Sequence, residues 1–234
     1  PFEHADHALK EWGQIWSYHG LEAHKLPEGA EEKWDALPSI STEQLRGALL
    51  TFPWVTAVGQ TGIHPRTLAT VSTEGLDVIA KLFMRCEELM RWPSKTIVRT
   101  LVRLPKPEGG ARLIALMSTL MRAWGRVRRP ISTQWEREHE TEEIWGVGKV
   151  RSSASSSFSH NLDAETAQLL DKGSITVITY LWKAFDTVAP EALMFEAEMV
   201  GFPRRLMGMI LLSCREPRVL KAHQSSSHVT VAQQ

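Results

Sequence analysis

The sequence has little of what marks a secreted, a disulfide-rich or a membrane protein. It contains only two cysteines, Cys86 and Cys214, whose spacing fits no metal site, so we expect reduced, buried thiols rather than a disulfide. No run of about 18 apolar residues is present, and the longest candidate, residues 207–212, is far too short to span a bilayer. The N-terminal residues form no secretory signal. We therefore predict a soluble, intracellular protein without membrane contact, in the nucleus or the cytoplasm.

The length of the chain permits a substantial core. Its 234 residues, 43% of them hydrophobic, are sufficient for one large domain or two small ones. The first residue is Pro1 rather than Met, from which we expect a piece of a longer protein.

The net charge of zero hides a strong segregation of charge along the chain. Residues 1–43 carry three Lys/Arg against nine Asp/Glu, residues 99–129 carry eight against one, and residues 130–171 carry three against eight. A basic block of this kind is typical of a surface that binds phosphates. The alternative is a solvated helix face that pairs with its acidic neighbours, and charge alone does not decide between the two.

Helix signals are found along most of the chain. Residues 1–26 have helical spacing of apolar residues, and a polar linker follows to about Pro38. A capping-box sequence at 41–44 predicts a short helix through Leu50, and the prolines and glycines of 53–65 predict a loop. Further helices are predicted from Ser72 to Trp92 at the latest, from 120 to 135 with a pause at Pro130, and at 162–170, 190–200 and 203–214, with a Ser-rich loop at 152–159.

Strand signals occur in two places. Residues 97–104 and 112–116 have β-type patterns, and the Gly/Pro-rich segment 105–110 between them predicts a β-hairpin. The β-branched run that starts at Ile175 predicts a buried strand. It leads into the sequence Lys-Ala-Phe-Asp-Thr-Val at 183–188.

This last stretch resembles motif A of reverse transcriptases, above all those of non-LTR retrotransposons, where the strand carries Asp-x-x-x-Ala-Phe-Asp. Ala184, Phe185 and Asp186 match, whereas Tyr180 stands at the position of the first Asp. Other segments resemble the family in the same order. They are Val58–Pro65, with Thr61 in place of an Asp; Trp92–Pro93 with Val102–Pro107; Arg112–Leu116, with Leu113 in place of a Pro; and Ala189–Leu193 with Gly201–Pro203.

The resemblance implies an α/β (α+β) fold, with helix-rich fingers followed by part of a right-hand palm. The sequence contains neither the Gln-Gly of motif B nor the Tyr/Phe-x-Asp-Asp of motif C, so we expect the palm to stop before the motif C hairpin. The expected domains are a helical N-terminal extension and linker at 1–39, fingers and partial palm at 40–221, and a polar tail at 222–234.

The resemblance also implies roles for particular residues. Lys106 and Arg112, across the hairpin turn, would hold the triphosphate of a nucleotide; the alternative is a pair of exposed hairpin cations. Phe185 would be the steric gate beside the sugar; the alternative is a core Phe at a strand end. RNA template and DNA primer would be the partners. Their expected contacts are Arg99, Arg103, Arg122, Arg126, Arg128 and Arg129.

The motif A substitution bears on catalysis. Mg²⁺ is the cofactor of the parent family and prefers carboxylate oxygen, whereas Tyr180 offers a phenol that is neutral at pH 7. If such a ligand contributes about 4 kcal/mol to the transition state, its loss costs about a thousandfold in rate. We therefore expect no intact catalytic residue, no productive Mg²⁺ binding and no polymerisation.

Three hypotheses about function remain open. The first is a fragment or decayed copy of a retroelement reverse transcriptase, whose parent reaction is RNA-templated DNA synthesis. The second is a non-catalytic, reverse-transcriptase-like module that binds nucleic acid. The third is an unrelated helical scaffold in which the motif A match is a coincidence.

Overall fold

The computed structural model describes Lys10 and residues 34–59, 61–94, 99–107, 109–141, 152–177, 189–214, 218–220 and 229–231. Most of the helix predicted at 1–26 lies outside the described residues, as do Tyr180 and Phe185. The chain forms two compact units, one of residues 1–130 with 184–234 and one of residues 131–183.

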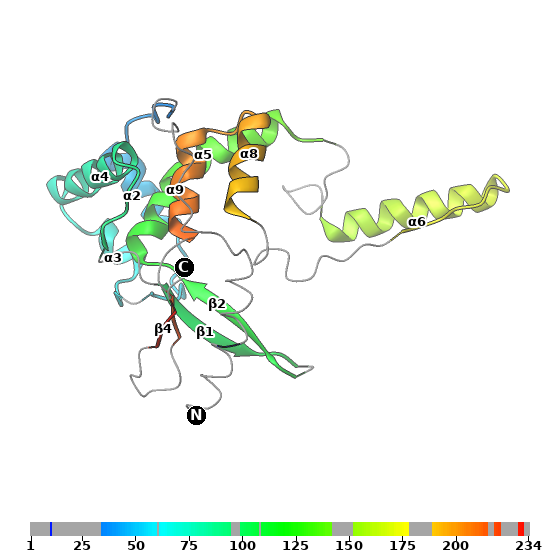
Figure 1. The fold of residues 1–234 in the computed structure, drawn as a ribbon, viewed down its shortest axis with the longest axis horizontal. Coiled ribbons are helices and arrows are strands. Elements are labelled where there is room, and N and C mark those ends of the chain that lie inside the picture. Colours follow the sequence, from blue (N-terminus) through cyan, green and yellow to red (C-terminus); the bar gives the residue numbers. More distant parts are fainter. Residues whose placement is uncertain are drawn as a thin grey trace. The chain divides into compact units, whose positions relative to one another are not determined.

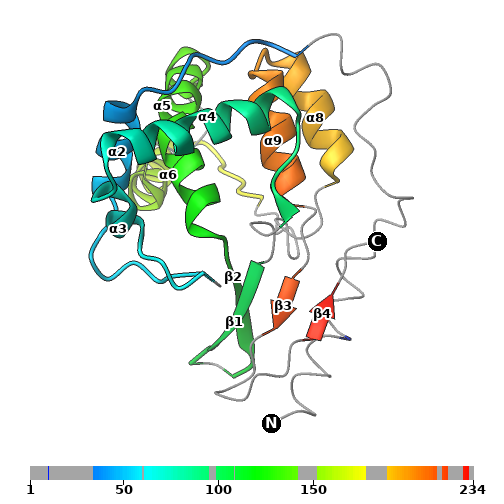
Figure 2. The same ribbon diagram turned by 90° about the vertical axis from the view of Figure 1, so that its left-hand side faces the viewer.

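The first unit combines helices with a small mixed sheet, in agreement with the predicted α/β class (Figure 1). Its helices are α2 (Thr42–Leu50), α3 (Pro65–Ala69), α4 (Thr73–Glu88), the first part of α5 (Thr119–Glu138), α8 (Pro190–Met199) and α9 (Arg204–Cys214). Its strands are β1 (Arg99–Pro105), β2 (Ala111–Leu116), β3 (Arg218–Leu220) and β4 (Val229–Val231). The strand order is β2-β1-β3-β4, with β1 parallel to β3 and the two outer pairs antiparallel. Figure 2 shows the helices of this unit at one end of the strands and the β1–β2 hairpin extending away from them.

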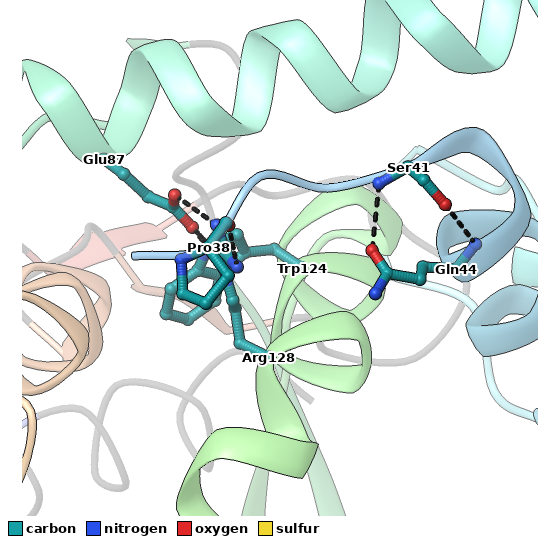
Figure 3. Close-up of polar contacts among 6 residues, drawn as sticks. All are labelled: Pro38, Ser41, Gln44, Glu87, Trp124 and Arg128. Atoms are coloured by element: carbon teal, nitrogen blue, oxygen red, sulfur yellow. Dashed lines mark hydrogen bonds and ion pairs between the residues drawn. The ribbon is translucent and has the colours of Figure 1, made fainter. Parts of the chain in front are cut away.

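Local signals account for the first helices. Ser41 Oγ accepts a hydrogen bond from the Gln44 N–H at 3.1 Å, and Gln44 Oε1 accepts one from the Ser41 N–H at 3.0 Å, so the predicted capping box is confirmed (Figure 3). Ser72 caps α4 as predicted, and the helix ends at Glu88. Buried apolar residues on one face of each helix then form the core between α2 and α4. These are Leu45, Leu49, Leu76, Ala80 and Phe83.

The β-hairpin predicted from the sequence is present. Its register pairs Leu104 with Arg112 and Pro105 with Ala111. Gly109 and Gly110 in the turn have φ angles of 93° and 79°, a region that residues with a Cβ avoid. The Gly-rich turn therefore allows the two strands to reverse within a few residues.

The segment 34–38 is part of the first unit, although the sequence predicted only an extension and linker there. Asp35 Oδ2 accepts a hydrogen bond from the Arg204 N–H at 3.1 Å, which caps the start of α9. The Trp34 ring packs closely on Gly208: a Cβ atom added at position 208 would lie 2.8 Å from carbon atoms of the indole ring. Pro38 O accepts a hydrogen bond from Arg128 at 2.7 Å. The segment thus joins α5 to α9.

The two helices predicted near the C-terminal end are present as α8 and α9, which pack against each other. The polar tail predicted at 222–234 contains the short strand β4, which was not predicted from the sequence. Its sequence, Val-Thr-Val, consists of three β-branched residues, which favour strands. Within the part of the chain that is described, no helix has the length and apolar character needed to cross a membrane.

Two predictions about helices were wrong. Helix α5 runs without a break through Pro130, since proline removes a single hydrogen bond and the turns before it are held by the buried Met121 and Trp124. In the second unit, α6 (Ser153–Leu169) covers the predicted Ser-rich loop. Ser152 Oγ accepts a hydrogen bond from the Ser155 N–H at 3.1 Å and so caps the helix. Serine is favoured at this N-cap position because its hydroxyl satisfies a free backbone N–H of the first turn.

The buried strand predicted from Ile175 is not found in the described residues 175–177. Ile175 and Val177 are 93% and 81% exposed, and neither lies in a strand. A strand needs a partner for its backbone hydrogen bonds, and the second unit has no other strand among its described residues.

The two cysteines are free, as expected, and they differ in burial. Cys86 is buried in α4, and this burial, followed by the nearby Glu87 charge, raises the pKa of its thiol, whereas Cys214 is partly exposed.

Because the thiolate is the reactive form, we expect DTNB at mildly alkaline pH to modify Cys214 well before Cys86. Replacing Cys214 with Ser is expected to remove the fast phase of the absorbance change. Equal rates for the two thiols would contradict the buried position of Cys86.

Candidate nucleic-acid interface

The hairpin brings two predicted nucleotide-binding cations to one face. Arg112 pairs with Leu104 across the strands, and the Lys106 N–H donates to Gly110 O at 3.2 Å, which extends the register by one pair. Side chains alternate between the faces of a hairpin, so Lys106 and Arg112 lie on the same face as neighbours on the diagonal. Arg112 is exposed and Lys106 half-buried. The face they share is therefore open to an anionic ligand.

Two arginines of the predicted nucleic-acid-binding set are buried, and we remove them from it. Arg128 is 4% exposed and pairs with the buried Glu87 at 2.6 Å. Arg99 is 8% exposed, and its guanidinium donates to the carbonyl and hydroxyl oxygens of Ser213. Both side chains satisfy acceptors within the fold, so their charge does not reach a ligand at the surface.

Arg122 and Arg126, one turn apart on α5, lie over the ring of Phe52. Their guanidinium carbons are 5.3 Å and 4.5 Å from the ring centroid, within the range of cation–π contacts. Arg122 also donates to Ala57 O at 2.5 Å. Burial, followed by the nearby Arg126 charge, lowers the pKa of Arg122. These half-buried cations remain in the candidate set.

The three remaining predicted residues are described to different extents. Arg129 is exposed on α5. Arg103 lies in β1, but only its backbone is described. Phe185, the predicted steric gate, lies outside the described residues.

The loop before α3 is hydrogen-bonded to the start of α5 and packs against the backbone just before it. Thr119 Oγ1 donates to Ile63 O at 2.5 Å, and Gly59 approaches so closely that a Cβ there would lie 2.6 Å from Met117 O. This loop holds the segment Val58–Pro65 that resembles the family. Its close packing explains why glycine is needed at position 59.

The same loop exposes a tryptophan that sequence reasoning missed. Trp54 is 77% exposed, the Arg66 guanidinium lies 4.2 Å from its ring centroid, and the His64 ring stacks beside it at 6.3 Å. The sequence feature that could have indicated this exposed residue is a large aromatic side chain within the segment 53–65, which was predicted to be a loop, with His64 and Arg66 close by. Trp34, by contrast, is half-buried and packs against Gly208 and the Arg204 guanidinium.

If the resemblance to motif A holds, a magnesium site of the parent type would lack its first carboxylate, because Tyr180 stands at that position and Mg²⁺ prefers carboxylate oxygen. Tyr180 and Asp186 both lie outside the described residues. Elsewhere, no three His, Cys, Asp or Glu side chains of the described chain lie together as ligands. We derive no step through a metal ion.

Comparisons with known proteins do not assign the chain to a family. No model of a protein family matches the sequence, and no curated protein matches it either.

Proposed function

We propose that this chain is a fingers and partial-palm segment of the retroelement reverse-transcriptase type, which binds nucleic acid and does not polymerise. The observation that carries the proposal is the hairpin of β1 and β2, where Lys106 and Arg112 share an open face next to a Gly-rich turn. The expected absence of polymerase activity rests on Tyr180, which stands at the position of the first Asp of motif A in the resemblance.

The expected ligand is an RNA template with a DNA primer, held through its phosphates. Binding of this kind releases counterions, so the logarithm of the affinity should fall linearly with the logarithm of the salt concentration. The exposed Arg112 and Arg129 and the half-buried Lys106, Arg122 and Arg126 supply the positive charge. A non-catalytic, reverse-transcriptase-like module that has kept the basic fingers and lost the metal site remains the second candidate, since it requires the same basic surface.

We expect replacement of Lys106 and Arg112 with Ala to weaken template–primer binding and to flatten its salt dependence. Each phosphate contact contributes about 0.9 to the slope, so the double variant should lose about two units. Fluorescence anisotropy of a labelled template–primer across a salt series measures both quantities. Primer-extension assays of the unmodified chain with Mg²⁺ and deoxynucleotides should show no product.

Two exposed cations on α4 provide the matched control for this experiment. Lys81 and Arg85 pair with Asp77 and Glu88 on the same helix, at 2.6 Å and 2.9 Å. The double variant Lys81→Ala and Arg85→Ala removes the same charge and should leave the slope unchanged. If the unmodified chain and the hairpin variant show the same slope of log affinity against log salt concentration, Lys106 and Arg112 do not contact the nucleic acid. The proposal then loses its main support.

A further inference from the structure

The loop around Trp54 presents an aromatic ring to the solvent, with Arg66 and His64 beside it. Trp54 is 77% exposed although its ring lies beside the Arg66 guanidinium, 4.2 Å from the centroid. The His64 ring is nearly parallel to it, at an interplanar angle of 14°. Much of the indole surface therefore remains open for another planar group.

Hydrogen bonds fix His64 and, through it, this arrangement. The Arg66 N–H donates to His64 Nδ1 at 3.1 Å, so Nδ1 is the unprotonated nitrogen. His64 Nε2 then carries the proton and donates to Pro53 O at 3.2 Å. The first bond ties the imidazole to the start of α3, and the second ties it to Pro53, the residue before Trp54. The imidazole beside Trp54 is therefore already ordered, so no conformational entropy has to be lost in ordering it when a ligand stacks on the indole.

The segments that form this surface carry no negative charge of their own. Residues 44–73 and 109–135 contain no Asp or Glu. They are in contact, since Arg122 of α5 donates to Ala57 O of the loop and Thr119 donates to Ile63 O. Arg122 and Arg126 lie over Phe52, two residues before Trp54. An exposed aromatic among cations matches the composition of surfaces that bind single-stranded nucleic acid.

We propose that Trp54, backed by Arg66, is a stacking platform for an unpaired base of a single-stranded nucleic acid. The inference rests on the proposed function and adds to it a second site, separate in sequence from the hairpin cations. The base stacks on the open indole surface, and Arg122 and Arg126 attract the phosphates of the same strand. Neither contact reads a particular base, so binding at this site is independent of sequence.

The experiment compares the unmodified chain with Trp54→Ala and Trp54→Phe. The probes are a labelled template–primer with a single-stranded template overhang, the same duplex with blunt ends, and the overhang with abasic positions. We expect Trp54→Ala to lose about 5- to 150-fold in affinity for the overhang, the range measured for one stacked base. Its affinity for the blunt duplex should not change, and Trp54→Phe should retain most of the overhang affinity. The unmodified chain should bind the abasic overhang more weakly than the intact overhang. Trp54→Ala should bind the two overhangs equally well.

Val55→Ala is the matched control, because Val55 is the next residue and is 93% exposed. Val55→Ala should bind every probe as tightly as the unmodified chain does. Trp54→Ala and Val55→Ala should both unfold at nearly the same urea concentration as the unmodified chain. If overhang affinity is the same with Ala at position 54, or if Val55→Ala costs as much, Trp54 is not a stacking platform and an apolar protein partner becomes the better occupant. If the unmodified chain binds none of the probes, the proposed function fails together with this inference.

Discussion

Replacing Glu87 with Ala is expected to destabilise the first unit by about 3–5 kcal/mol, the cost of breaking a buried ion pair. Glu87 is 3% exposed and accepts three hydrogen bonds, two at Oε1 and one at Oε2 (Figure 3). The donors are Trp124 Nε1 at 2.7 Å and two guanidinium nitrogens of Arg128 at 2.7 Å and 2.6 Å. Without the carboxylate, Arg128 keeps a buried charge whose only described acceptor is Pro38 O.

Urea unfolding followed by tryptophan fluorescence measures the effect. The matched control is Glu88→Ala, the neighbouring residue, whose exposed pair with Arg85 should contribute about 0–1 kcal/mol. Replacing Glu87 with Leu and Arg128 with Met together removes both charges, and it should cost less than the sum of the two single replacements. A loss of less than about 1 kcal/mol for Glu87→Ala would show that the carboxylate is not buried with Arg128.

Replacing Gly59 with Ala is expected to cost about 1–3 kcal/mol and to displace the loop that bears Trp54. A Cβ at position 59 would lie 2.6 Å from Met117 O and 3.2 Å from its carbonyl carbon. Both atoms belong to the backbone between β2 and α5, so no side-chain rotation relieves the clash. The overhang affinity should fall with stability, because the same loop positions Trp54.

Gly47→Ala is the control for this replacement. Gly47 lies within α2, and a methyl group at this position would meet no atom within 4 Å beyond the adjacent residues and the backbone of its own helix. Alanine should therefore stabilise the helix by up to about 1 kcal/mol. The two replacements add the same methyl group and are expected to change stability in opposite directions. If both raise the urea midpoint, the close approach of Gly59 to Met117 does not exist in solution.

The elements that the sequence predicted well are those with short-range signals. The capping box at Ser41 and Gln44 and the Gly-rich turn at 109–110 act over three or four residues, and both elements formed where expected. The Ser-rich start of α6 misled the prediction because serine favours both loops and helix N-caps. Only the hydrogen bond between Ser152 and Ser155 distinguishes the two uses.

The candidate site was harder to predict because charge counts ignore burial. Arg99 and Arg128 lie in the same basic block as Arg122 and Arg126, yet they satisfy acceptors inside the fold. Their partners are far away in sequence, so no local pattern separates the two groups. Trp54 was missed for the opposite reason: an aromatic residue is usually assigned to the core, and its exposure depends on tertiary packing.

The segment 34–38 shows that a motif boundary and a folding boundary need not coincide. The resemblance to a known family starts near Ile40, but Asp35 and Pro38 each satisfy a donor on a distant helix. These residues carry none of the shared chemistry, and they close the gap between α5 and α9. The packed part of this chain therefore extends upstream of its recognisable motifs. Substitution of Asp35 would remove a side-chain acceptor from the start of α9, whereas the main-chain acceptor at position 38 is present whatever residue stands there.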